Sequence, residues 1–148
     1  MTLPPGPLLG LSDKEERESA MGRNRDIEAE DYYEMACEWI RAGEPGRAEE
    51  CLIHTIRLNQ RFIHAYIDLA ALYNRQKRYQ ESVHAMRKAL RHDPGFHQLY
   101  YLLAVYSFRN GEYGSSLRTI DRAIQLNPCR LYNRVRAVIE RHHRKVRL

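Results

Sequence analysis

Apolar and small residues return along this chain at a fixed spacing of 34 residues. Within residues 62–94 they also recur three and four positions apart, the spacing of one face of an α-helix. The pairs that match across 34 positions are Tyr66 and Tyr100, Leu69 and Leu103, Ala70 and Ala104, Tyr79 and Tyr113, Ala89 and Ala123, and Pro94 and Pro128. A weaker copy precedes them at Tyr32, Met35, Ala36, Ala48, Leu52 and Ile56. Such a period predicts stacked copies of one supersecondary unit.

Each copy divides into two predicted helices, with glycine or proline at most of the boundaries and a turn at residue 77 in the second copy. The expected helices cover about 27–42, 45–58, 62–75, 79–92, 96–109 and 113–126, with a last one at about 129–145. The first should bury Tyr32, Met35, Ala36 and Trp39, and the last should bury Leu131, Val135, Val138 and Ile139. The predicted fold class is therefore all-α: a right-handed α-solenoid of three antiparallel helix pairs plus a C-terminal capping helix.

The ends of the chain differ from this repeated centre. Residues 26–128 hold the three predicted repeats, at about 29–62, 63–96 and 97–130, and residues 129–148 form a basic amphipathic capping helix. Residues 1–25 are expected to be a flexible N-terminal arm, because residues 1–11 carry three prolines and residues 22–25 are typical of a linker. Ser12 and Glu15 form a capping box that could start a short polar helix within this arm.

The pattern within the second unit resembles a known family. Tyr66, Leu69, Ala70 and Tyr73, followed by Ser82, Met86, Ala89 and Pro94, are similar to the signature of the tetratricopeptide repeat. The resemblance covers about residues 29–130 and implies that the first helix of each pair lines a concave, protein-binding surface. Thr55, Gln60 and Ser107 depart from the signature, which puts local packing in doubt but not the architecture.

By register with the family, the concave surface is assigned to twelve residues. They are Tyr33, Cys37, Ile40, Arg41, Ile67, Ala71, Asn74, Arg75, Tyr101, Val105, Phe108 and Arg109, to which the cap could add Tyr132 and Val135. Most of them are apolar and lie beyond the positions that the core uses, which is typical of a partner site. The groove would then hold a helical or extended segment of another protein. The alternative is that the N-terminal segment or the curl of the superhelix covers part of it.

One subfamily of similar proteins grips the C-terminal carboxylate of heat-shock chaperones with lysine, asparagine and arginine. The matching positions here are Tyr33, Cys37, Asp68, Gln98 and Leu102. None of them matches, and the carboxylate of Asp68 would repel that ligand. The sequence therefore excludes this ligand class.

Two groups of basic residues leave alternatives open. Arg41, Arg75 and Arg109 recur at one repeat position, where they would either meet acidic groups of a partner or simply end their helices favourably. Residues 129–148 carry seven basic residues against one acidic residue, within a net charge of +5. A candidate basic patch of Arg141, Arg144, Lys145 and Arg147 would either bind nucleic acid or serve solubility.

Catalytic chemistry has no signature in this sequence. Cys37 has no base placed beside it, His142 and His143 are adjacent and diverge on a helix, and no phosphate loop or paired carboxylates occur. We therefore expect no enzyme, cofactor, metal or catalytic residue. No apolar run is long enough for membrane insertion, and an odd number of cysteines favours reduced thiols in the cytoplasm.

The predicted function is a protein–protein interaction module that acts as an adaptor, assembly factor or dedicated chaperone. The alternative is a nucleic-acid- or ribosome-associated factor that works through the basic C-terminal helix. The sequence names no partner and leaves the oligomeric state open, with a monomer favoured.

Overall fold

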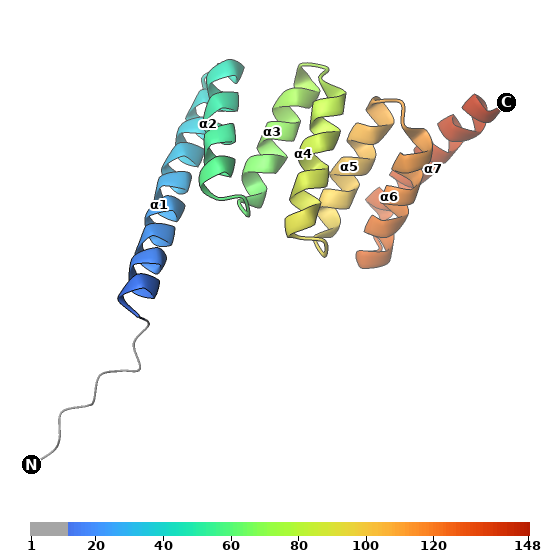
Figure 1. The fold of residues 1–148 in the computed structure, drawn as a ribbon. Coiled ribbons are helices and arrows are strands. Elements are labelled where there is room, and N and C mark those ends of the chain that lie inside the picture. Colours follow the sequence, from blue (N-terminus) through green and yellow to red (C-terminus); the bar gives the residue numbers. More distant parts are fainter. Residues whose placement is uncertain (1–11) are drawn as a thin grey trace, which may run out of the picture.

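Seven helices stand side by side in one row in the computed structural model, which describes residues 12–148 (Figure 1). They are α1 (Asp13–Arg41), α2 (Pro45–Leu58), α3 (Ile63–Arg75), α4 (Tyr79–His92), α5 (His97–Arg109), α6 (Tyr113–Leu126) and α7 (Arg130–Arg147). The first six form three antiparallel pairs and α7 packs on the last pair. The chain is thus the predicted α-solenoid, with α1 and α7 at its opposite ends (Figure 1).

Small residues let the two helices of each pair approach closely. Ala70 of α3 and Ser82 of α4 are both fully buried, and the Ser82 hydroxyl donates a 2.8 Å hydrogen bond to the Ala70 carbonyl. The next pair repeats this contact, because the Ser116 hydroxyl donates to the Ala104 carbonyl at 2.6 Å. The repeated small residues therefore provide a polar link as well as close packing.

The turn inside each pair uses one residue with a left-handed backbone. These residues are Gly43 (φ 74°), Lys77 (φ 60°) and Gly111 (φ 81°), at the same position of successive repeats. The turn after Tyr73 is closed by hydrogen bonds from the Lys77 amide to the Asn74 carbonyl and from the Arg78 amide to the Tyr73 carbonyl. This pattern ends a helix sharply and fixes the reversal of the chain.

The N-terminal helix is longer than the sequence indicated. The linker predicted at residues 22–25 is wrong, because α1 is continuous over Asp13–Arg41. Its N-terminus has the expected capping box between Ser12 and Glu15. One glycine, Gly22, costs a helix only about 1 kcal/mol and does not end it among strong helix formers. The expectation for residues 1–11 lies outside the described residues.

Two predicted buried faces are correct only in part. On α1, Ala36 is fully buried and Tyr32 and Trp39 are half-buried, but Met35 is 45% exposed, since the buried stripe is centred on Ala29 and Ala36. On α7, Leu131 and Val138 are 51% and 44% exposed. The predicted burial of these two residues is wrong. The face of α7 that packs against α5 and α6 carries buried or half-buried residues, namely Tyr132, Val135 and Ile139.

Candidate protein-binding surfaces

The first helices of successive pairs are joined by hydrogen bonds between residues 35 positions apart, one more than the repeat length. The Tyr33 hydroxyl of α1 donates to the Asp68 carboxylate of α3 at 2.7 Å. Farther along, the Arg109 guanidinium of α5 donates to the Asn74 side-chain oxygen of α3 at 2.6 Å. These bonds join three of the predicted positions, Tyr33, Asn74 and Arg109, and also Asp68, the neighbour of the predicted Ile67. Together they form one row across α1, α3 and α5. We call this row the inner face.

Tyr33 is fixed firmly at the start of the inner face. Its ring lies 4.8 Å from the ring of Phe62, and its hydroxyl is held by Asp68. Burial, followed by the hydrogen bond to Asp68, raises the pKa of Tyr33 far above its ordinary range. The Tyr33 hydroxyl therefore keeps its proton, and its hydrogen bond to Asp68, to a higher pH than an ordinary tyrosine would.

The apolar part of the inner face also belongs to the core. Ile67 and Val105 are half-buried and pack against the central core cluster. Tyr33 and Ile40 pack in the same way against the first cluster. The expectation that these positions lie beyond the core is therefore wrong: they contribute to packing, and only part of each side chain remains accessible. Ala71, one turn after Ile67 on α3, is also half-buried, and we call Ile67, Ala71 and Val105 the inner-face strip.

The capping helix covers the third-unit part of the inner face. Tyr132 of α7 stacks on Tyr101 with ring centroids 5.0 Å apart and planes 19° apart. The Tyr132 hydroxyl lies 2.7 Å from a ring nitrogen of His97. Phe108 meets the ring of His142 edge-on at 5.0 Å. Tyr101 and Phe108 thus hold α7 in place, which leaves less of their surface to a partner.

The three arginines at the C-terminal ends of the first helices have different surroundings. Arg41 donates to the Cys37 carbonyl of its own helix at 3.4 Å. Arg109 reaches across to Asn74, and Arg75 is exposed. They therefore form no uniform ladder of free guanidinium groups, although all three stand at helix C-termini, where positive charge is favourable.

The candidate basic patch lies at the exposed end of α7. Arg141, Lys145 and Arg147 are exposed there, whereas Arg144 forms an ion pair with Glu140 at 2.8 Å. Glu140 also forms an ion pair with Arg136, and Arg136 forms a second one with Asp121 of α6 at 2.6 Å. Part of the positive charge of α7 therefore serves to fix the cap, and the remainder faces solvent.

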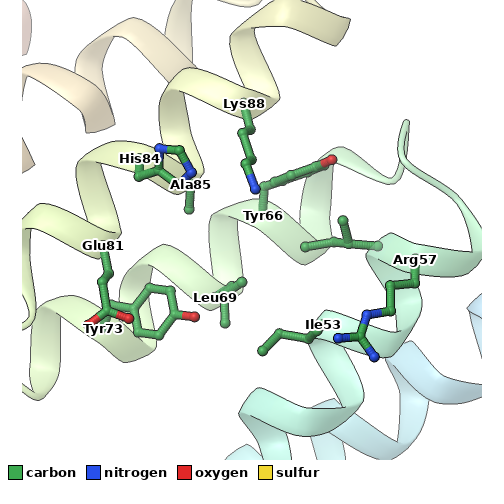
Figure 2. A pocket seen from close by; sticks show the side chains of 10 residues that line it. Ile53, Arg57, Tyr66, Leu69, Tyr73, Glu81, His84, Ala85 and Lys88 are labelled. Atoms are coloured by element: carbon green, nitrogen blue, oxygen red, sulfur yellow. The ribbon is translucent and has the colours of Figure 1, made fainter.

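A cleft that sequence reasoning missed lies between α2 and α4, with α3 as its floor (Figure 2). It encloses about 370 Å³. Tyr66 and Leu69 form the floor and Ile53 lies on the α2 side, while Arg57 and Lys88 stand on the side of Tyr66 (Figure 2). The cleft is apolar at its base with basic groups at one end, which suits an apolar side chain beside an acidic group.

One residue difference between repeats accompanies this cleft. Ile53 stands where the following repeat has Arg87, which is 34 positions later. Arg87 forms a 3.7 Å ion pair with Glu112 across the junction between the second and third pairs. At the junction between the first and second pairs, the residue that corresponds to Glu112 is Arg78, which forms ion pairs with Glu49 and Glu81 instead. The cleft therefore has an apolar residue on its α2 side where the next repeat carries a charge, a difference that can be found in the sequence.

Two general properties of the described residues bear on function. No helix among residues 12–148 is both long and apolar enough to cross a membrane. In the same part of the chain, no three histidine, cysteine, aspartate or glutamate side chains are grouped so that they could hold a metal ion.

Solved structures with similar folds include three tetratricopeptide repeat domains. The Arabidopsis OM64 domain is 16% identical with a TM-score of 0.71, and 80% of this chain and 98% of that one are covered. The TPR2B domain of yeast Sti1, in complex with a pHsp70 peptide, is 20% identical with a TM-score of 0.71 (78% and 98% covered). The first TPR of Spaghetti (RPAP3), bound to the HSP90 peptide SRMEEVD, is 14% identical with a TM-score of 0.73 (79% and 94% covered).

Sequence comparison identifies the family. No curated protein matches the chain in sequence. A family model for the tetratricopeptide repeat matches residues 33–95 and again residues 68–128, which together make up most of the chain. The two overlapping matches agree with the helix pairs of the structure and with the spacing of their turns. The chain therefore belongs to the tetratricopeptide repeat family.

Proposed function

We propose that this protein binds a helical or extended segment of a partner protein on its inner face. The observation that carries the proposal is the row of half-buried side chains across α1, α3 and α5, tied together by the Tyr33–Asp68 and Asn74–Arg109 hydrogen bonds. A surface held rigid in this way loses little entropy when a ligand binds. Repeat domains of this shape offer such extended surfaces to partners.

The chemistry of the inner face favours an apolar segment over an acidic one. The neighbours from Sti1 and RPAP3 are complexes with chaperone peptides, and the RPAP3 peptide ends in EEVD. In this chain the centre of the row holds the Asp68 carboxylate, already engaged by Tyr33. An acidic chain end placed there would meet a like charge. The half-buried strip of Ile67, Ala71 and Val105 instead suits apolar side chains of a helix.

Within the cell, such a module would act as an adaptor, an assembly factor or a dedicated chaperone. We place it in the cytoplasm, because Cys37, Cys51 and Cys129 are all free thiols, and free thiols are typical of a reducing compartment. A binding role rather than an enzymatic one agrees with the absence of catalytic signatures in the sequence. The α2–α4 cleft is a second candidate surface for the same function, favoured by its depth and apolar floor.

The test begins with identification of a partner by pull-down and mass spectrometry, followed by titration of three variants. Ala71→Arg covers the inner-face strip, Ile53→Gln makes the wall of the cleft polar, and the basic-patch variant changes Arg141, Arg144, Lys145 and Arg147 to Gln. We expect Ala71→Arg to weaken binding about 30-fold, since blocking the centre of an interface costs about 2 kcal/mol. The other two variants should stay within about threefold at near-physiological salt.

Circular dichroism first establishes that each variant is folded. If Ala71→Arg binds like the wild type and Ile53→Gln loses binding, the cleft is the site and the inner-face proposal is wrong. If only the basic-patch variant loses binding, the alternative function through the basic C-terminal helix replaces it.

A further inference from the structure

The exposed large apolar side chains gather at the two ends of the solenoid. Among the described residues they are Met21, Ile27 and Met35 on α1, Leu131, Val138 and Val146 on α7, the neighbouring Leu148, and Leu126 at the end of α6. Helices α2 to α5 contribute none to this group. Exposed apolar residues that gather in one place mark contact surfaces. The two end helices therefore differ from the middle of the stack.

The outward face of α7 is basic. It lies opposite the buried Tyr132 and Ile139, and its exposed residues follow at helical spacing: Arg130, Arg134, Ala137, Arg141 and Lys145. Within residues 12–148, none of its four basic side chains forms an ion pair, unlike Arg136 and Arg144. Leu131 and Val138 lie along one edge of this stripe. We call it the basic end face.

The outward face of α1 is acidic. It lies opposite the buried Ala29 and Ala36, and its exposed residues are Ile27, Asp31, Glu34, Met35 and Glu38. Across the part of the chain that the structure describes, no ion pair engages its three carboxylates; the one formed within α1 joins Lys14 and Glu18. The whole of α1 carries ten acidic residues against five basic ones, and α7 carries seven basic residues against one acidic residue. We call this stripe the acidic end face.

We propose that copies of this protein associate head to tail, with the acidic end face of one copy against the basic end face of the next. The two faces belong to helices at opposite ends of the row, so both remain available in one molecule (Figure 1). Each is a single helical stripe, about 17 Å long from Ile27 to Glu38 and about 22 Å from Arg130 to Lys145. Such a heterologous contact extends into short chains or closes into a ring.

A second copy fits these faces better than a nucleic acid does. A phosphate backbone would use the charges of the basic end face but not the exposed Leu131 and Val138 beside them. The acidic end face offers both complementary charge and its own apolar residues, Ile27 and Met35. A monomer is the expectation from the sequence alone, and the pairing of these faces favours association instead.

The first test is light scattering or sedimentation of the full chain over a range of concentrations. At about 20 mM salt the weight-average mass should rise with concentration to at least twice that of one chain. At about 0.5 M salt it should return toward a single chain, because screening weakens the charge contacts. A wild type that stays monomeric at low salt over the whole range overturns the proposal.

Charge reversal then tests the faces themselves. The acidic-face variant is Asp31→Lys with Glu34→Lys, and the basic-face variant is Arg134→Glu with Arg141→Glu; all four positions are exposed, so both should fold, as circular dichroism will verify. Each variant alone should be monomeric, because its altered face no longer complements its intact one: the double reversal changes the acidic end face from three negative charges to a net charge of +1, and the basic end face from four positive charges to a net charge of zero. An equimolar mixture should associate again, since each variant restores a partner for the other.

This mixing step separates head-to-tail contact from other arrangements. Association of either variant alone at the wild-type level overturns the proposal, as does a mixture that remains monomeric. A 20-base-pair DNA duplex serves as the competing probe. A monomeric wild type that binds this duplex through Arg134 and Arg141 would assign the basic end face to nucleic acid and also overturn the proposal.

Discussion

Replacing Lys77 with glycine should raise the free energy of unfolding, because Lys77 is held in a backbone conformation that side chains disfavour. Its φ of 60° matches those of Gly43 and Gly111 in the neighbouring repeats. A residue with a Cβ atom loses about 1–2 kcal/mol in this left-handed region. Because an unfolded chain with glycine has more conformational freedom to lose on folding, the substitution also lowers the free energy of unfolding by about 0.5–1 kcal/mol. The net gain should therefore be about 0.5–1 kcal/mol.

The structure indicates that this difference is mainly a backbone effect. The closing hydrogen bond from the Arg78 amide to Tyr73 is 2.8 Å long, and the equivalent bonds from Glu44 and Glu112 are both 2.9 Å long. The turn thus has one geometry whether lysine or glycine occupies it. Lys77 is exposed, and among the described residues its side chain makes no hydrogen bond or ion pair that the substitution would remove.

Three glycine-to-alanine changes provide matched controls. A Cβ atom added at Gly43, Gly46 or Gly111 would meet nothing within 4 Å, so none of them introduces a clash. Gly43→Ala and Gly111→Ala should each lose about 1 kcal/mol, because alanine is strained at positive φ. Gly46 lies in the first turn of α2 without positive φ, so Gly46→Ala should gain about 0.5–1 kcal/mol.

Urea unfolding followed by circular dichroism measures all four variants. For a chain of this size, 1 kcal/mol moves the thermal midpoint by about 2–4 °C, so Lys77→Gly should raise it by about 1–4 °C. The reasoning is refuted if Lys77→Gly is no more stable than the wild type while Gly43→Ala and Gly111→Ala lose nothing. That result would mean that the three turns are not left-handed.

Two further predictions rest on buried polar groups. Ser82→Ala and Ser116→Ala should each lower the free energy of unfolding by about 1 kcal/mol, since each hydroxyl bonds across its helix pair. Ser107→Ala should leave the free energy of unfolding unchanged or raise it by a similar amount, because the fully buried Ser107 hydroxyl has no hydrogen-bond partner among residues 12–148. A loss of stability for all three variants in urea unfolding would contradict this. Burial, with a contribution from Glu49, raises the pKa of Tyr73 to about 12 from an ordinary value near 10. The neutral phenol therefore contributes a free energy of unfolding that is fully present below pH 10 and is lost as the pH rises toward 12. The same fall should be less steep in Tyr73→Phe. Equal slopes of stability against pH in wild type and Tyr73→Phe would show that this phenol does not contribute.

The repeated positions allowed most of the helices to be predicted from the sequence. Pro45 fixed the start of α2, and the stripe of small and apolar residues carried it to Leu58, where the structure also ends it. A proline or a left-handed turn residue marks a helix boundary by local chemistry, and the 34-residue spacing carries each boundary to the next repeat. These signals do not depend on tertiary context.

The two ends of the chain were harder to predict, because no neighbouring repeat constrains them. The first part of α1 is polar on all sides, and Gly22 suggested an interruption that helix-forming residues around it override. On α7 an apolar stripe of Leu131, Val135, Val138 and Ile139 was expected to face the core, and only Val135 and Ile139 of these do so. The structure buries Tyr132 instead, since its ring stacks on Tyr101 and its hydroxyl meets His97. Hydrophobic spacing alone does not choose between two such faces.

The candidate binding surfaces could likewise be predicted only where they depend on the repeat register. Register with the repeats placed the inner face, because Tyr33, Ile67 and Tyr101 occupy one position in successive units. Register did not show that Tyr132 covers Tyr101, which depends on how α7 packs. Nor did it indicate the α2–α4 cleft, whose two walls come from helices of different pairs.

Positions that stay the same between repeats and positions that change serve different purposes. Ala36, Ala70 and Ala104 are identical and fully buried, since a small residue at this position lets the two helices of each pair approach closely. Asp68 is not shared by every repeat: leucine stands at this position in the next repeat, at 102, and glutamate in the preceding one, at 34. Its carboxylate is held by Tyr33 on the inner face, where it would oppose an acidic ligand without disturbing the crossings. A change at Asp68 should therefore alter the choice of ligand more than the fold.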